Sequence, residues 1–235
     1  YAVSYQPTLQ MLVAEGLPVV RVGVLVAQLL NALVALEDGP VKTLADFKGR
    51  KIGYSIAGFD EALLGAMLES AGLTLKDVTL INVNFALTTA LMSKQVDGVI
   101  GAFRNFELND LELHKAKGRI WLVEKNGVPV YDELIVVAKR ETVDVARTKK
   151  LLAAVAEATA WLKANPAEAS RSFFAFGKDL DNELNRLAWK DTLPLLADDP
   201  FALDRARYET FAAFLVKRGL IKQAPALDSY LRDMR

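Results

Sequence analysis

The sequence contains no cysteine and only one histidine, His114. Without cysteine the chain can form neither disulfide bonds nor thiolate metal sites, and it has no cysteine nucleophile. A single histidine in a polar stretch leaves almost nothing from which to build a histidine metal cluster or a Ser-His-Asp triad. We therefore expect no metal site, no cofactor and no catalytic constellation of these kinds.

Net charge and long apolar runs are missing as well. The 29 Lys and Arg residues balance the 29 Asp and Glu residues, so no net field favours nucleic acid or an anionic membrane surface. The longest apolar candidate, residues 19–36, is broken by Arg21, Gln28 and Asn31, so we expect no membrane span in this chain. With 52% hydrophobic residues among 235, the chain can bury a large core.

Strand-like and helical segments alternate through the first 140 or so residues. Runs rich in β-forming residues predict strands at residues 1–5, 18–26, 33–36, 52–55, 78–83, 96–103, 120–123 and 134–138. Helical spacing and capping patterns predict helical segments at residues 8–15, 43–49, 60–72 and 86–93. From Asp144 onward we expect only helices, at residues 144–165, 166–176, 181–193 and 204–218. The pattern indicates an α/β fold with a helical C-terminal third.

The strand–loop–helix unit at residues 50–73 is central to this arrangement. Its strand leads through a glycine-containing turn, residues 57–59, into a helix that opens with Asp60 and Glu61. Such a loop leaves backbone N–H groups unpaired at a helix start, and ligands in open α/β sheets bind beyond the carboxyl ends of strands. The alternative is a plain connection, because most turns of this kind only join two elements.

The order of the segments predicts two lobes. One compact α/β block, from residue 43 to about residue 121, has strands on both sides of it in the sequence, which indicates a second lobe inserted into the first. We expect lobe 1 to comprise residues 1–39 and 131–235, and lobe 2 residues 40–130, with crossings near Gly39-Pro40 and residues 127–131. A cleft between two such lobes is a natural small-molecule site.

Five stretches of the sequence carry a family resemblance. They are AVSYQP at residues 2–7, GLPVVRVG at 16–23, KIGYSIAGFDEALL at 51–64, ALMSKQVDGVIGAFRNFEL at 90–108 and GVPVYDELI at 127–135. Together they resemble the thiamine-precursor-binding proteins of bacterial ABC importers, the ThiY type, over roughly the whole chain. GAFRNFEL and VPVYDEL are the most specific pieces, whereas VDGVIGA occurs widely among substrate-binding proteins.

The resemblance implies a two-lobe, type II periplasmic-binding-protein fold. It implies a periplasmic or extracytoplasmic protein that closes on a formylaminopyrimidine or a hydroxymethylpyrimidine and presents it to a membrane permease. Proteins of that family begin with a further strand, helix, strand and helix, and this chain starts, strand-like at Tyr1, where that segment would end. We therefore expect this first segment, which supplies a strand of lobe 1 and an aromatic wall of the pocket, to be missing here.

The implied ligand requires aromatic walls and a hydrogen-bond acceptor. A flat, neutral ring with an exocyclic amine stacks on aromatic side chains, and Tyr131, Phe103 and Tyr5 are at the ends of strands or crossings. Glu133 follows Tyr131 by two residues in an extended segment, so the two side chains would share a face. We expect Glu133 to accept a hydrogen bond from the ligand amine. Ordinary core packing is the alternative for each aromatic residue.

The charged candidates have structural alternatives too. Glu133 could instead form a salt bridge with Arg104 or Lys139. Arg104 could hold a formyl or phosphate oxygen of the ligand, or it could tie the two lobes together by pairing with Glu107 or Asp132. We favour the structural role for Arg104.

Three further residues complete the candidate site. Asn105 follows the strand at residues 96–103 at its carboxyl end, which is a ligand position in α/β sheets. Gly58 and Phe59 are expected to close over the ligand, with backbone N–H groups as donors.

Two other functions remain open within the resemblance. The same fold carries a pyrimidine synthase of thiamine biosynthesis, but that group relies on a histidine and a cysteine-rich motif, and this chain has no cysteine and His114 outside the matching stretches. A relative could instead bind a sulfonate, nitrate or a flavin precursor. A basic pocket would favour the anions, whereas Glu133 beside Tyr131 favours a neutral, donor-rich ring. A sensing domain of a regulator would require a DNA-binding helix pair, which the sequence lacks.

Overall fold

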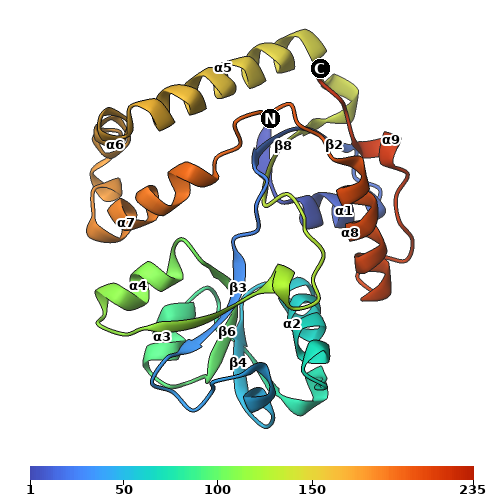
Figure 1. The fold of residues 1–235 in the computed structure, drawn as a ribbon. Helices are drawn as coiled ribbons and strands as arrows, with labels where there is room; N and C mark the ends of the chain where they lie inside the picture. The colour runs from blue at the N-terminus through green and yellow to red at the C-terminus, as the bar shows by residue number, and fades with distance from the viewer. The chain divides into compact units, whose positions relative to one another are not determined.

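The computed structural model describes all 235 residues, which divide into two compact units. Unit 1 comprises residues 1–29 and 129–235, and unit 2 comprises residues 30–128. The chain therefore leaves unit 1 once and returns to it once (Figure 1). None of its helices combines the length and the apolar character that crossing a membrane requires.

Unit 1 contains a three-stranded antiparallel sheet and most of the helices. The strands, in the spatial order β1-β8-β2, are β1 (Ala2–Ser4), β8 (Leu134–Lys139) and β2 (Val19–Val26). The helices are α1 (Gln6–Ala14), α5 (Val145–Ala164), α6 (Pro166–Ala175), α7 (Glu183–Thr192), α8 (Arg205–Lys217) and α9 (Leu227–Tyr230). Asp144 caps α5 as the sequence predicts, because its carboxylate accepts the Arg147 N–H at 2.9 Å.

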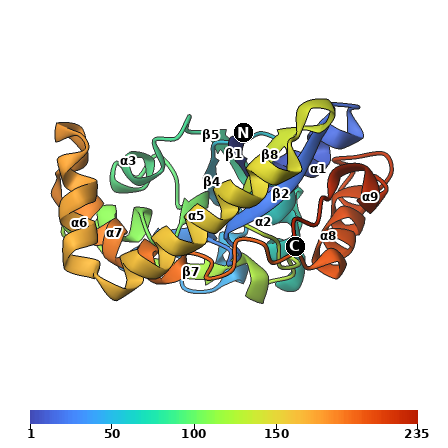
Figure 2. The same cartoon turned by 90° about the horizontal axis from the view of Figure 1, so that it is seen from above.

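Alternating side chains of β2 and β8 build a core on each face of this sheet. Val24 and Ile135 belong to a cluster with residues of α1, α8 and α9, and α8 and α9 lie side by side (Figure 2). Val22 and Val136 point to the opposite face, where they join Leu152 of α5. Side chains of the two strands alternate between the two faces of the sheet, and helices cover the apolar side chains on both faces.

Unit 2 contains a five-stranded mixed sheet in the order β5-β4-β6-β3-β7. The strands are β3 (Asn31–Leu36), β4 (Lys51–Tyr54), β5 (Thr79–Asn82), β6 (Gly98–Phe103) and β7 (Gly118–Leu122). The helices are α2 (Phe59–Ser70), α3 (Leu87–Met92) and α4 (Glu107–Leu113), with α2 on one side of the sheet and α3 and α4 on the other (Figure 1). β4 runs parallel to β5 and β6, and β3 runs antiparallel to β6 and β7.

Two expectations from the sequence differ from the structure. The first crossing was expected near Gly39-Pro40, but the units divide between residues 29 and 30, because β3 pairs with both β6 and β7 and so belongs to unit 2. No helix was predicted in the polar stretch at residues 107–117, but this stretch begins with α4. Acidic residues hide the helical spacing of Leu108 and Leu111 in this helix, and Leu111 is fully buried.

A bulge in β6 brings the sheet backbone against the start of α2. The register of β6 with β3 shifts at Gly101, whose φ of +90° is in the left-handed region that favours glycine. A Cβ atom at Gly101 would lie 2.9 Å from the Asp60 Oδ2 atom. The Asp60 side chain is 1% exposed, and this burial raises the pKa of its carboxyl group above the ordinary value.

The raised pKa of Asp60 predicts that Asp60→Asn stabilises the protein at neutral pH. A carboxyl group whose folded-state pKa exceeds its unfolded-state pKa stabilises the fold below the unfolded value and loses that contribution as the pH rises through the folded value. The stability difference between the variant and the wild type should therefore grow from about pH 4 to pH 7, measured by denaturant unfolding. Asp77→Asn is the control and should destabilise at pH 7, because a hydrogen bond from the Thr74 N–H lowers the pKa of Asp77. A loss of stability in both variants would contradict the prediction.

A close approach at Gly127 predicts a second stability effect. Gly127 and Gly16 both have φ of +91°, but a Cβ atom at Gly127 would lie 2.9 Å from the Ala66 carbonyl oxygen of α2, whereas one at Gly16 would meet nothing within 4 Å. Both Gly→Ala variants lose about 1–2 kcal/mol from the left-handed backbone, and only Gly127→Ala adds an overpacking cost of about 1–3 kcal/mol. Denaturant unfolding followed by circular dichroism should show this excess, and equal losses would contradict it.

Candidate functional site

The segment just before β8 buries three polar side chains in a row. Tyr131, Asp132 and Glu133 are 0%, 3% and 1% exposed, respectively. Burial of a carboxylate is costly unless hydrogen bonds or opposite charges compensate it. Two adjacent buried carboxylates therefore require specific partners.

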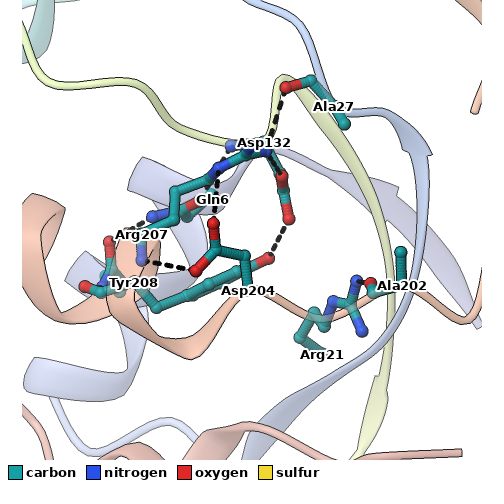
Figure 3. A network of polar contacts seen from close by, with 9 residues as sticks. Gln6, Arg21, Ala27, Asp132, Ala202, Asp204, Arg207 and Tyr208 are labelled. Atoms are coloured by element: carbon teal, nitrogen blue, oxygen red, sulfur yellow. Dashed lines mark hydrogen bonds and ion pairs between the residues drawn. The ribbon is translucent and has the colours of Figure 1, made fainter.

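Asp132 has such partners in unit 1 (Figure 3). Its carboxylate forms an ion pair with Arg207, and it accepts a hydrogen bond of 2.9 Å from the Tyr208 hydroxyl. The Asp132 N–H donates to the Gln6 side-chain oxygen at 2.8 Å, and the Gln6 N–H donates back to the Asp132 carbonyl at 3.2 Å. Burial and the Asp132 charge raise the pKa of Tyr208 well above its ordinary value, so its hydroxyl remains a donor.

Arg207 extends these contacts to a fourth segment. Its Nη1 atom also donates to the Ala27 carbonyl at 3.0 Å, just after β2, and its Nε atom lies 3.8 Å from Asp204 Oδ2 at the start of α8 (Figure 3). The segment before β8 is thus held by α1, α8 and the end of β2.

The aromatic candidates of unit 1 have different environments. The Tyr131 ring packs edge-on against Phe211 of α8, with ring centroids 4.9 Å apart and planes at 61°. Tyr131 is therefore a core residue of unit 1 with no exposed area. Tyr5 is only partly buried at the start of α1, so its ring is the more open of the two.

Tyr5 and Glu133 lie close enough to interact electrostatically. Burial, and then the Glu133 charge, raise the pKa of Tyr5, which keeps its hydroxyl protonated at neutral pH. The two cations considered as partners of Glu133 from the sequence also have other partners, because Arg104 pairs with Glu124 and Lys139 pairs with Glu141 at 3.4 Å. The structure thus brings Tyr5, Tyr131 and Glu133 together in unit 1.

The other five candidates lie in unit 2 at one edge of its sheet. Gly58 and Phe59 follow β4, and Phe103, Arg104 and Asn105 end or follow β6. Because β4 and β6 are parallel neighbours, their carboxyl ends meet at the same edge. Phe103 is partly buried, and Phe59 and Asn105 are each 8% exposed, so Phe59 packs inside unit 2 rather than on its loop.

Arg104 is engaged in a structural ion pair. Its Nη1 and Nη2 atoms bind the two Glu124 oxygens at 3.0 and 2.9 Å, in the fork geometry that suits guanidinium and carboxylate. The sequence analysis favoured a structural role for Arg104, but with Glu107 or Asp132 as its ion-pair partner. Glu107 instead accepts the Phe103 N–H at 2.6 Å, and Asp132 pairs with Arg207.

The loop after β4 donates three of its amide groups to acidic side chains of α2. Asp60 Oδ2 accepts the Ser55 and Ile56 N–H groups at 3.0 and 2.8 Å. Glu61 accepts the Gly58 N–H at 3.3 Å. Carboxylates in the first turn of α2 therefore close the loop, in accord with the preference of helix N-termini for negative charge.

Sequence reasoning missed two buried polar residues at this edge. The Oδ1 atoms of Asp60 and Asn31 are buried without a hydrogen-bond partner. The available signals were the position of Asp60 directly after the loop and the interruption of an apolar run by Asn31. No cluster of three or more His, Asp or Glu side chains is arranged to hold a metal ion.

Comparisons with known proteins match the sequence resemblance. Residues 1–169 match the family described as NMT1/THI5 like. A Haemophilus influenzae protein whose name assigns it provisionally to thiamine biosynthesis is 51% identical over 230 residues, covering 97% of this chain and 73% of that protein. The formylaminopyrimidine-binding protein of Halalkalibacterium halodurans is 31% identical over 172 residues, covering 72% of this chain and 52% of that protein.

A more distant relative is an enzyme. The 4-amino-5-hydroxymethyl-2-methylpyrimidine phosphate synthase of Schizosaccharomyces pombe is 23% identical over 184 residues, covering 74% of this chain and 53% of the enzyme.

Solved structures show the fold. The alkanesulfonate-binding protein SsuA of Xanthomonas axonopodis pv. citri, bound to MOPS, matches with a TM-score of 0.73 and 16% identity over 98% of this chain and 79% of that chain. The periplasmic aliphatic sulphonate-binding protein SsuA of Escherichia coli matches with a TM-score of 0.73 and 18% identity over 96% of this chain and 78% of that chain. The resemblance found in the sequence is thus confirmed: the chain belongs to the NMT1/THI5-like family and has an α/β periplasmic-binding-protein-like fold.

Proposed function

We propose that the chain is the substrate-binding protein of an ABC importer and that it captures a thiamine-precursor pyrimidine, of the formylaminopyrimidine or hydroxymethylpyrimidine type. The observation that carries the proposal is the burial of the Glu133 side chain, which is 1% exposed, in the segment before β8. The name of the Halalkalibacterium halodurans relative supports the ligand class. In this proposal the protein works outside the cytoplasmic membrane and delivers the ligand to a membrane permease.

The Glu133 carboxylate and the Tyr5 hydroxyl match the hydrogen-bonding pattern of an aminopyrimidine. The Glu133 carboxylate accepts a hydrogen bond from the exocyclic amine, and the Tyr5 hydroxyl donates to a ring nitrogen. The partly buried rings of Tyr5 and Phe103 give the ligand apolar faces, and each stack contributes about 0.5–1.5 kcal/mol beyond burial of area. Tyr131, whose ring lies against Phe211, supports the Glu133 segment from within unit 1.

An anionic ligand fits these groups less well. Arg104, the cation that sequence analysis considered for an anion, is neutralised by both oxygens of Glu124. A sulfonate or nitrate would also meet the negative charge of Glu133. The SsuA structures are 16–18% identical to this chain and support its fold rather than its ligand.

In the proposed mechanism the two units close on the ligand. A ligand stabilises the closed state only through its greater affinity for that state, so residues of both units take part in binding. The closed form is then the one that the permease receives.

A ligand panel tests the proposed function. We expect formylaminopyrimidine or hydroxymethylpyrimidine to stabilise the protein by about 2.7 kcal/mol at a hundredfold excess over its dissociation constant, and to compact it in small-angle scattering. Thermal unfolding in the presence of pyrimidines, sulfonates, nitrate and flavins is the measurement. Stabilisation by an anion or a flavin and by no pyrimidine would reject the proposal.

Removal of the Glu133 charge should weaken pyrimidine binding. A hydrogen bond to a charged group contributes about 1.5–3 kcal/mol, so Glu133→Gln should raise the dissociation constant by roughly 10- to 150-fold in isothermal titration calorimetry. The matched control is Glu141→Gln, because Glu141 is exposed and pairs only with Lys139 at the surface. Equal affinities of the Glu133 variant and the wild type would contradict the assigned role.

A further inference from the structure

Three large apolar side chains are exposed just after parallel strands of unit 2. Ile56 follows β4, Phe85 follows β5 and Phe106 follows β6, and they are 45%, 72% and 38% exposed, respectively. β4 pairs in parallel with both β5 and β6, so the carboxyl ends of the three strands meet at one edge of the sheet. Single exposed apolar residues are ordinary on a protein surface, but here one follows each of three adjacent strands.

Phe85 is the most exposed of the three, and its backbone is held in an unusual conformation. Its φ of +67° and the φ of +51° at Asn84 are in the left-handed region, which a bulky side chain rarely adopts. The Asn84 N–H donates to the Asn82 side-chain oxygen at 2.9 Å, and the Phe85 N–H donates to the Ser55 hydroxyl oxygen at 3.0 Å. The turn is thus tied to the end of its own strand and to the loop after β4.

The apolar neighbours of Phe85 have a different environment. Val83 and Leu87, two residues before and after it, are 7% and 4% exposed and belong to the core cluster of unit 2. Both flanking side chains therefore reach the core, whereas the Phe85 ring is directed to the solvent. A glycine would adopt this backbone conformation without strain, and a polar side chain would expose less apolar surface. Backbone strain of this kind is concentrated at ligand-binding sites.

Phe103 is the other aromatic candidate at this edge, and it is less accessible. It is the last residue of β6, pairs with Asn31 of β3 and is partly buried. Its N–H donates to the Glu107 carboxylate at 2.6 Å. Phe103 therefore belongs to the sheet, whereas Phe85 lies in the loop beyond it and has the larger exposed fraction.

We propose that Phe85 is a specificity-determining residue whose ring stacks on the flat face of the pyrimidine, and that Ile56 and Phe106 contact the edges of the same ligand ring. This inference rests on the proposed pyrimidine-binding function and adds contacts next to the candidates Phe103 and Asn105. The occupant is a small aromatic ring, because ligands of open α/β sheets bind beyond the carboxyl ends of strands. A protein partner would need about 20–30 residues on each side, far more than three side chains.

A competing explanation is that Phe85 serves only the turn after β5. Phe85→Gly separates the two explanations, because it removes the ring and also relieves the left-handed backbone. We expect it to raise the thermal unfolding temperature by about 2–4 °C. The same variant should weaken formylaminopyrimidine binding roughly 10- to 50-fold in isothermal titration calorimetry on the full chain. A residue that served only the fold would not change stability and affinity in opposite directions.

Two further variants are matched controls. Lys94, just after α3, has a φ of +59° and is also exposed. Lys94→Gly therefore relieves a left-handed residue of the same unit, so it should raise the unfolding temperature by a similar amount and change the affinity less than twofold. Phe85→Tyr keeps an aromatic face at the same place and should weaken binding less than threefold.

The outcomes separate this inference from the proposed function. A wild-type protein that binds no pyrimidine overturns the proposed function and the inference with it. Wild-type binding together with an unchanged affinity of Phe85→Gly overturns the inference alone. The same conclusion follows if Phe85→Tyr or Lys94→Gly weakens binding as much as Phe85→Gly does. It follows too if sedimentation shows a wild-type dimer that Phe85→Gly dissociates, because the exposed ring would then join two copies of the chain.

Discussion

Unit 1 depends on one ion pair, between the buried Asp132 before β8 and the partly buried Arg207 in α8. A buried carboxylate is stable only where charge and hydrogen bonds compensate its lost hydration, and here Arg207, Tyr208 and Gln6 supply them. These partners come from α1 and α8, near opposite ends of unit 1 in the sequence. Breaking the pair would leave an uncompensated charge in the core, so the start of β8 has little freedom to shift.

This constraint also fixes the extended segment that contains Glu133. Glu133 is adjacent to the anchored residue, and its charge contributes to the raised pKa of Tyr5. The chain belongs to the NMT1/THI5-like family and has an α/β periplasmic-binding-protein-like fold.

In unit 2, two parallel strands of the mixed sheet determine where the candidate residues lie. Its candidate residues lie at the carboxyl ends of β4 and β6, where the bulge at Gly101 brings the backbone against Asp60. Two first-turn acids of α2 occupy the loop amides that would otherwise bind an anion.

Local periodicity was enough to predict nearly all strands and helices, because strand alternation, helical spacing and caps such as Asp144 are encoded within a few residues. The acidic helix α4 was missed where charges hide that spacing. The sequence also indicated the family and the candidates Tyr131 and Glu133. Only the tertiary structure decided that β3 belongs to unit 2, that Arg104 pairs with Glu124, and that Asp132 meets Tyr208, 76 residues away. Such pairings depend on how the chain folds back on itself, and no local pattern of residues records which distant side chains will meet.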